Sequence, residues 1–188
     1  YLRQHNIFMN LLSESNISTL NKKSHLKIKN LILFSVIVFL GSYFLTNYLI
    51  FKAYIPTGSM RPTIMEEDEV IVSKIYTSIN RGDIFVFSHE SSEELLIKRV
   101  VGLPGEKVEV KDGLLYVNDV FIDEPYVKNN ESMNKTFYVP EGNYLFFGDN
   151  RARSEDARRW ENPYVPKKNL DGKALFTVYP KDRIGFLK

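Results

Sequence analysis

The 188-residue sequence contains no cysteine, which excludes disulfides, thiolate nucleophiles and metal sites with cysteine ligands. Histidine is scarce, with three residues, and the formal net charge of +2 is too small to indicate a nucleic-acid-binding protein. No segment repeats at a fixed period. The length favours one domain with an appendage. The first residue is Tyr1 rather than Met, which is compatible with a natural start further upstream.

Charge is missing altogether from residues 31–50, which read LILFSVIVFLGSYFLTNYLI. A helix of about 20 such residues is about 30 Å long and matches the hydrocarbon core of a bilayer. A buried helix of this length is normally amphipathic, and a signal peptide has an apolar region of about 7–15 residues before a small-residue cleavage site. The run fits neither description. We therefore predict an uncleaved transmembrane anchor over residues 31–51.

The charges on either side of the anchor predict its orientation. Residues 1–30 carry five basic residues and one acidic residue, and four of the basic residues lie between positions 22 and 29. Residues 66–69, beyond the anchor, are all acidic. Under the positive-inside rule, residues 1–30 are a cytoplasmic tail and residues 52–188 are an extracytoplasmic domain at the cell membrane.

Long helical periodicity is absent after residue 54. Short apolar and β-branched runs recur instead, and Asp112-Gly113 between two of them is a hairpin signal. The runs are EVIVSKI at 69–75, IFVF at 84–87, LLIKRVVG at 95–102, KVEVK at 107–111, LLYV at 114–117, YLFF at 144–147 and ALFTVY at 174–179. They predict a mainly β domain, an antiparallel sandwich or barrel. The polar segment 123–135 is predicted to be a mobile loop.

Two polar segments and one lysine carry candidate chemistry, and each has an ordinary structural explanation. YIPTGSMRPTI at 54–64 holds two hydroxyls just after the anchor, but a serine beside a glycine is usually a turn residue. GDNRARSEDAR at 148–158, taken alone, is a loop with surface ion pairs. Lys98 interrupts an apolar strand next to Arg99, and because a strand alternates its faces, one of the two must point inward unless the strand is an edge. A desolvated lysine would have a lowered pKa.

Together, and in this order, these segments resemble the sequence boxes of bacterial type I signal peptidases. The matching residues are Ser59-Met60-Arg61-Pro62-Thr63, Gly82-Asp83-Ile84, Lys98-Arg99-Val100-Val101-Gly102 with Pro104-Gly105, and Gly148-Asp149-Asn150-Arg151 with Ser154, Asp156 and Arg158. The resemblance covers residues 22–186, and Ala157 departs from it where the family usually has serine. The lysine is typical of the bacterial type, since a histidine takes its place in the endoplasmic-reticulum type.

The resemblance implies a membrane-bound serine endopeptidase that removes signal peptides from exported preproteins without a cofactor or a metal. It implies Ser59 as the nucleophile and Lys98 as the general base, with the Ser59 backbone N–H and the Thr57 hydroxyl holding the oxyanion. Ser154 is expected to hydrogen-bond the lysine amine and orient it. The remaining charged residues are expected to form an ion-pair scaffold around the site: Asp149, Asp156, Arg151 and Arg158.

The histidines are poor candidates for the base. His5 and His25 fall in the predicted cytoplasmic tail, and His89 lies in a polar stretch. Ser59 follows Ile50 by nine residues, so at ~3.3–3.6 Å per residue it stays within about 30 Å of the lipid bilayer. The expected partners are preproteins with small residues at two positions that point into the enzyme, and no obligate protein partner is expected.

Two alternatives remain open. One is a self-cleaving Ser–Lys protease of the repressor type, which the anchor and the short N-terminal tail argue against. The other is a non-catalytic, membrane-anchored relative of signal peptidases, for example a scaffold in pilus assembly. A catalytic dyad requires the Lys98 amine and the Ser59 hydroxyl to lie within about 2.6–3.2 Å of each other.

Overall fold

The computed structural model describes residues 27–44 and 48–187, and the chain divides into two compact units, Tyr1–Thr46 and Asn47–Lys188. In the first unit the described residues form one helix, Lys27–Phe44, whose large apolar side chains are exposed. It is long and apolar enough to cross a membrane, in agreement with the predicted anchor. The predicted cytoplasmic tail lies outside the described residues as far as residue 26.

The last two residues of the predicted anchor, 50 and 51, lie in a strand. Residues 45–47 lie outside the described residues, and Ile50–Tyr54 is a strand, β1, paired antiparallel with β2 (Glu69–Ser73). Phe51 packs against buried residues of the β domain, so its apolar side chain faces a protein core. An apolar run that passes from a helix into a strand cannot be divided by composition alone.

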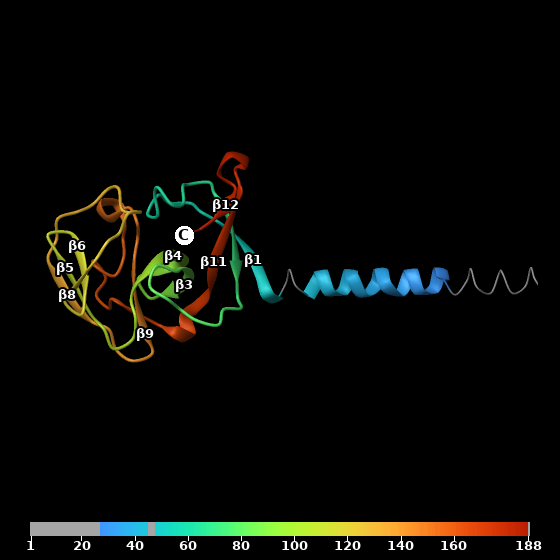
Figure 1. Ribbon diagram of the computed structural model, residues 1–188, viewed down its shortest axis with the longest axis horizontal. Coiled ribbons are helices and arrows are strands. Elements are labelled where there is room, and N and C mark those ends of the chain that lie inside the picture. Colours follow the sequence, from blue (N-terminus) through green and yellow to red (C-terminus); the bar gives the residue numbers. More distant parts are fainter. Residues whose placement is uncertain (1–26, 45–47, 188) are drawn as a thin grey trace, which may run out of the picture. The chain divides into compact units, whose positions relative to one another are not determined.

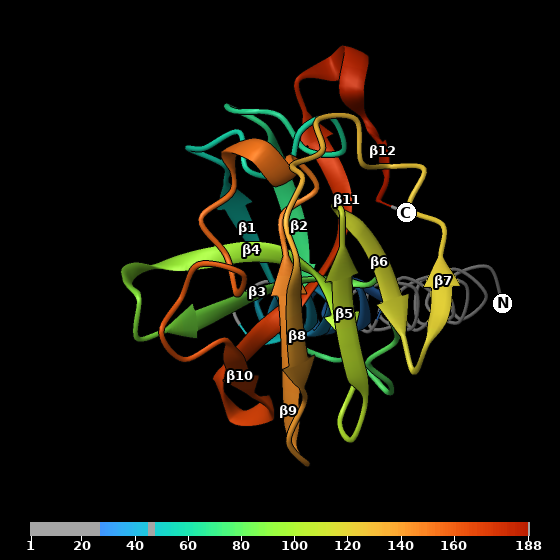
Figure 2. The ribbon, with the colours of Figure 1, turned by 90° about the vertical axis from the view of Figure 1, so that its left-hand side faces the viewer.

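The second unit consists of two antiparallel sheets (Figures 1 and 2). The larger has the order β1-β2-β11-β3-β4-β9-β10, with β12 paired to β11, and the smaller has the order β7-β6-β5-β8. Figure 1 shows the smaller sheet on the side of this unit away from β1. The other strands are β3 (Ile84–His89), β4 (Ser92–Gly102), β5 (Lys107–Lys111), β6 (Leu114–Val117), β7 (Val120–Ile122), β8 (Lys135–Tyr138), β9 (Asn143–Phe147), β10 (Tyr164–Pro166), β11 (Leu170–Tyr179) and β12 (Gly185–Phe186).

The prediction of a mainly β domain is confirmed, and each of the seven predicted runs coincides with a strand over all or most of its length. The hairpin between β5 and β6 is also confirmed. Asp112 and Gly113 have φ angles of 50° and 82°, and a two-residue turn with positive φ at both positions matches the twist of the paired strands. The sequence patterns did not indicate four further short strands of two to four residues, which are β7, β8, β10 and β12.

β4 is the strand that positions the candidate site. Lys98 is paired with Phe85 of β3, and Arg99 is paired with Phe147 of β9, so Lys98 is not an edge-strand lysine. Lys98 is 3% exposed and Arg99 is 1% exposed. Both faces of this part of β4 are covered. The basic side chain buried on each face therefore needs its own polar partner.

Two clusters of buried apolar side chains form the core. The larger contains Phe87 and Phe146, whose ring centroids are 4.4 Å apart, and the smaller contains Met60 and Ile64. Burial of each such side chain stabilises the fold by about 1.5–3 kcal/mol. The smaller cluster therefore anchors the chain immediately after Ser59.

Candidate active site

Ser59 lies in the segment of turns between β1 and β2, and buried side chains hold it on both sides. Met60 is fully buried, and the Ile64 N–H donates to the Met60 carbonyl at 3.0 Å to close one turn. Ile55 is also buried, and its N–H donates to the Asp68 carbonyl at 3.0 Å. These buried apolar neighbours leave Ser59 only 7% exposed, and their hydrogen bonds hold the backbone on both sides of it.

Lys98 reaches this serine across 39 residues of sequence. Its Nζ lies 2.8 Å from Ser59 Oγ and 3.1 Å from the Ile97 carbonyl oxygen. The first distance lies within the ~2.6–3.2 Å over which a base can remove the proton of a nucleophile. A serine hydroxyl is a weak nucleophile without such a base, so this contact gives the pair a chemical capability that neither residue has alone.

The environment of Lys98 favours the neutral amine. Burial lowers the pKa of Lys98 from 10.5 to about 8, because the charged ammonium loses its water. The carboxylates of Asp156, Asp149 and Glu155 act in the opposite direction and limit the fall in this pKa. A pKa of about 8 leaves about one amine in ten neutral at pH 7, and that form can accept the Ser59 proton.

Thr57 stands beside the same hydroxyl. Its Oγ1 lies 3.4 Å from Ser59 Oγ, and its side chain is at the exposed rim of the site. A hydroxyl here can donate to an oxygen that develops negative charge next to the nucleophile. Its geometry is therefore compatible with the role that the sequence predicts for it.

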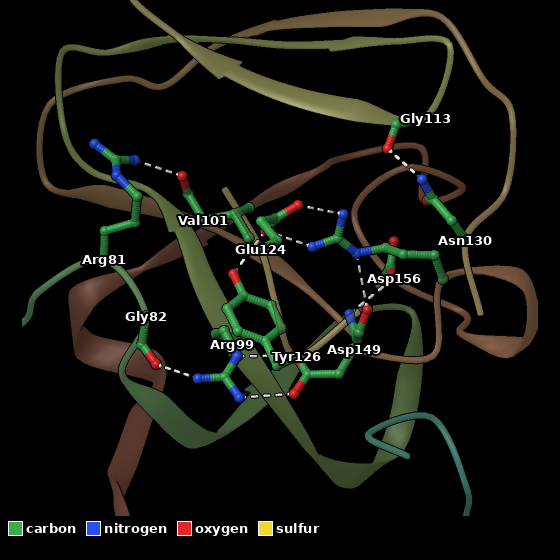
Figure 3. A network of polar contacts seen from close by, with 12 residues as sticks. Arg81, Gly82, Arg99, Val101, Gly113, Glu124, Tyr126, Asn130, Asp149 and Asp156 are labelled. Carbon is green, nitrogen blue, oxygen red and sulfur yellow. Dashed lines mark hydrogen bonds and ion pairs between the residues drawn. The ribbon is translucent and has the colours of Figure 1, made fainter. Parts of the chain in front are cut away.

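Arg99, the next residue of β4, forms a buried ion pair with Asp149 (Figure 3). Arg99 Nε and Nη2 donate to the two carboxylate oxygens of Asp149 at 2.9 and 2.7 Å, and Nη1 donates to the Gly82 carbonyl at 2.7 Å. The Thr63 hydroxyl donates to Asp149, and the Arg99 guanidinium lies 3.9 Å from the ring centroid of Tyr126. Removing one partner of such a pair leaves a buried charge and typically costs about 3–5 kcal/mol.

A second buried carboxylate, Asp156, holds the turn that contains Asp149. It accepts the Gly148 N–H at 2.9 Å, and Arg158 Nε and Nη2 donate to it at 2.9 Å each. Arg151 was predicted to belong to this scaffold. Its guanidinium pairs with Glu124 at 2.8 and 2.6 Å, and its Nε donates to the Gly148 carbonyl at 3.1 Å. The scaffold therefore joins residues from three distant parts of the chain.

The family model for signal peptidases, peptidase S26, matches residues 28–179 of this chain. The chain belongs to this family. Membership identifies it as a peptidase, and the matched residues include the nucleophile candidate, β4 and the polar turn after β9.

Individual members of the signal peptidase family are similar over most of the chain. A signal peptidase I of Leptolyngbya laminosa is 36% identical over 81% of this chain and 79% of its own length. Signal peptidase I S of Bacillus subtilis (strain 168) is 32% identical over 90% of this chain and 96% of its own length. The crystal structure of a signal peptidase I from Enterococcus faecalis V583 is 32% identical and covers 53% of this chain and 98% of that chain, with a TM-score of 0.47.

One contact expected of a signal peptidase box is not formed. Ser154 is fully buried, and its Oγ makes no hydrogen bond within residues 27–44 and 48–187, whereas Lys98 Nζ contacts Ile97 instead. Ser154 packs against Gly148. A Cβ at Gly148 would lie 2.2 Å from Ser154 Oγ and 2.5 Å from the Ser59 carbonyl oxygen. In this geometry Ser154 makes no hydrogen bond to Lys98, and an orienting role toward the lysine amine stays a prediction.

Three residues that contact the site were not among the predicted site residues. Asn150 donates from its backbone to the Ser59 carbonyl at 3.0 Å, and it belongs to a signal peptidase box that could have indicated it. Glu124 and Tyr126 contact the buried arginines from the segment predicted to be a mobile loop. No local pattern could reveal these two, since an ion pair between residues 27 apart depends on packing.

The departure from the family pattern at Ala157 lies in the core. Ala157 is fully buried in the larger apolar cluster, and its N–H donates to the Phe146 carbonyl at 3.4 Å. A methyl group suits that apolar position without touching the reacting pair. No group of three or more His, Asp or Glu side chains is placed to hold a metal ion among the residues that the structure describes.

Proposed function

We propose that this chain is a membrane-bound signal peptidase that cleaves exported preproteins with a Ser59–Lys98 dyad. The observation that carries the proposal is the 2.8 Å contact between the Ser59 hydroxyl and a buried lysine amine. Burial supports the mechanism because it lowers the pKa of Lys98 to about 8 and makes the neutral amine available. The family match supports the substrate, since its members are named for signal peptides.

In the acylation half of the reaction, Lys98 removes the proton from Ser59 Oγ as this oxygen attacks the carbonyl carbon of the scissile peptide bond. The Ser59 N–H and the Thr57 hydroxyl donate to the resulting oxyanion. Lys98 then gives its proton to the leaving amine, the C–N bond breaks, and the mature protein departs. The signal peptide remains as an ester of Ser59.

In the second half of the reaction, the neutral Lys98 amine takes a proton from a water molecule, and the water oxygen attacks the ester carbonyl. The same two donors hold the second oxyanion. The bond to Ser59 Oγ breaks, Ser59 regains its proton from Lys98, and the signal peptide leaves as a carboxylic acid that releases its proton to water. The two halves therefore use one base in both directions.

A cavity of about 430 Å³ between β1 and β4 supports an extended peptide substrate. Its lining combines apolar side chains with the reacting groups, including Ile55, Val86, Ile97, Thr57 and Lys98. Apolar walls beside the base exclude water and favour small apolar side chains near the scissile bond. This lining agrees with the expected A-x-A-like cleavage pattern.

Cleavage by the purified, detergent-solubilised protein is the direct test. We expect incubation with a preprotein to release a mature chain whose new N-terminus, read by sequencing, follows a small residue. Ser59→Ala should give no product while remaining folded and membrane-bound, because the nucleophilic oxygen is missing. Cleavage by Ser59→Ala at the unmodified rate would contradict the assignment of the nucleophile.

The pH dependence follows from the titration of Lys98. Only the neutral amine can accept the serine proton, so kcat/KM should rise about tenfold per pH unit well below the lysine pKa. The rise should level off above about pH 8, where burial places the pKa of Lys98. Measuring kcat/KM from pH 6 to pH 10 tests this, and an acid limb centred near pH 6 would instead indicate a histidine.

The proposed orientation puts residues 1–30 in the cytoplasm and residues 52–188 outside the membrane, since lysines precede the anchor helix. Protease added outside intact cells should therefore digest the β domain and leave the N-terminal tail protected. Epitope tags at the two ends would report this by immunoblotting. Protection of the β domain with digestion of the tail would reverse the orientation.

A further inference from the structure

Two asparagines connect the segment 123–135 to the backbone of the nucleophile. Asn129 Nδ2 donates to Asn150 Oδ1 at 2.6 Å, and Asn150 Nδ2 donates to the Gly58 carbonyl at 2.9 Å. The Asn150 backbone N–H also donates to the Ser59 carbonyl at 3.0 Å. Asn129 itself is held by its own carbonyl, which accepts the Ala152 N–H at 3.1 Å.

These contacts define the orientation of the Asn150 side-chain amide. The Gly58 carbonyl can only accept, so the NH₂ group of Asn150 must face it. The Asn129 NH₂ group can only donate, so it requires the carbonyl oxygen of Asn150 on the other side. Asn150 is 5% exposed, and a flipped amide would leave buried groups facing like partners, which is costly. Asn129 therefore selects the amide orientation that binds Gly58.

Holding the Gly58 carbonyl also determines the direction of the Ser59 N–H. The two groups belong to one peptide unit, which is planar and trans, and they point in opposite directions. The contact from Asn150 to the Ser59 carbonyl holds the next peptide unit in the same way. Ser59 is thus held from both sides, and the N–H assigned to the oxyanion is oriented before substrate arrives, as transition-state stabilisation requires.

We propose that Asn129 is a positioning residue of the active site, which acts through Asn150 to hold the Gly58–Ser59 peptide with its N–H directed at the substrate oxyanion. The inference rests on the function proposed above. Asn129 touches neither the substrate carbonyl nor the Ser59–Lys98 pair in this arrangement, and it lies outside the sequence boxes. Its effect should therefore appear in the stabilisation of the oxyanion and leave the base unchanged.

Substitutions at Asn129 and a matched neighbour test the proposal. Asn129→Ala should lower kcat about tenfold with little change in KM, since a small misplacement of a catalytic group has large effects on rate. Asn129→Asp should lower kcat about 10²-fold, because its carboxylate would attract the Asn150 NH₂ group and turn the amide oxygen toward Gly58. In Asn129→Ala, the acid limb of the pH profile should stay where it is in the unmodified protein.

Asn130 provides the control, because it is the adjacent residue of the same type and binds elsewhere. Its Nδ2 donates to the Gly113 carbonyl at 3.0 Å, as Figure 3 shows. Asn130→Ala and Asn130→Asp should cleave at the unmodified rate, and the second of them controls for the added charge. If the Asn129 variants match these controls while Ser59→Ala is inactive, only the present inference fails. If the unmodified protein does not cleave preprotein, the proposed function fails.

A double-mutant cycle separates positioning from a general structural effect. In the background of Asn150→Ala, the further change Asn129→Ala should alter kcat less than about twofold, because its path to Gly58 is already removed. A full additional tenfold loss would overturn the proposal. If Asn150→Ala does not fold, the kcat values of the single variants decide. The proposal requires the highest kcat for the unmodified protein, a lower one for Asn129→Ala and the lowest for Asn129→Asp. Any other order overturns it.

Discussion

Lys98→Arg is expected to abolish preprotein cleavage, with a loss of at least about 10⁴-fold, although the substitution keeps the positive charge. Arginine retains its proton at any accessible pH and cannot accept the proton of Ser59. Lys98→Ala should be equally inactive, because no other base replaces the lysine. His89, the only histidine among the residues that the structure describes, is stacked on Trp160 at 4.1 Å and hydrogen-bonded to Ser91. The measurement is the rate of preprotein cleavage at pH 8 to 9.

A lysine of the smaller sheet controls for the exchange itself. Lys107 of β5 is partly exposed and forms ion pairs with the buried Glu109 and the exposed Asp119 at 3.0 Å each, and arginine keeps the charge that both pairs need. Lys107→Arg should cleave at the unmodified rate. Thermal denaturation should show that Lys98→Arg remains folded at the assay temperature. Cleavage by folded Lys98→Arg at the unmodified rate would exclude the Ser–Lys mechanism and restore the non-catalytic scaffold or another base as explanations.

Thr57→Val is expected to lower kcat by about 10²–10³-fold, the typical effect of losing one oxyanion donor. Valine keeps the shape of threonine and removes the hydroxyl, which lies 3.4 Å from Ser59 Oγ. Folding should change little, because the side chain is exposed. Thr57→Ser retains the donor and should stay active. Single-turnover kinetics with a preprotein would report the acylation step directly.

Thr136 offers the matched control for this exchange. It is an exposed threonine of β8, in the smaller sheet, and Thr136→Val should leave kcat unchanged. If Thr57→Val cleaved as fast as Thr136→Val, the Thr57 hydroxyl would not be directed at the oxyanion. Of the two proposed oxyanion donors, only the Ser59 N–H would then be left. The loss of kcat in the Asn129 variants would measure how much this N–H contributes.

Local pattern was sufficient for much of this protein. The uncharged run at 31–50 predicted an apolar helix, because the length and polarity of a membrane span are properties of a continuous segment. The strands and the Asp112-Gly113 turn were predictable for a similar reason, since alternation and positive φ are imposed residue by residue. Ser59 and Lys98 emerged as candidates only as members of an ordered set of boxes.

Distance, burial and choice of partner were decided by the tertiary structure alone. Ser59 and Lys98 are 39 residues apart in sequence, and only the packing of their segments brings their polar atoms to 2.8 Å. Alternation along β4 predicted that one of the two basic side chains would be buried. Both Lys98 and Arg99 are buried, because other parts of the chain cover both faces of the strand. Ser154 makes no hydrogen bond in the described part of the chain, and Asn129 gains a role, because long-range packing determines which polar groups can reach each other.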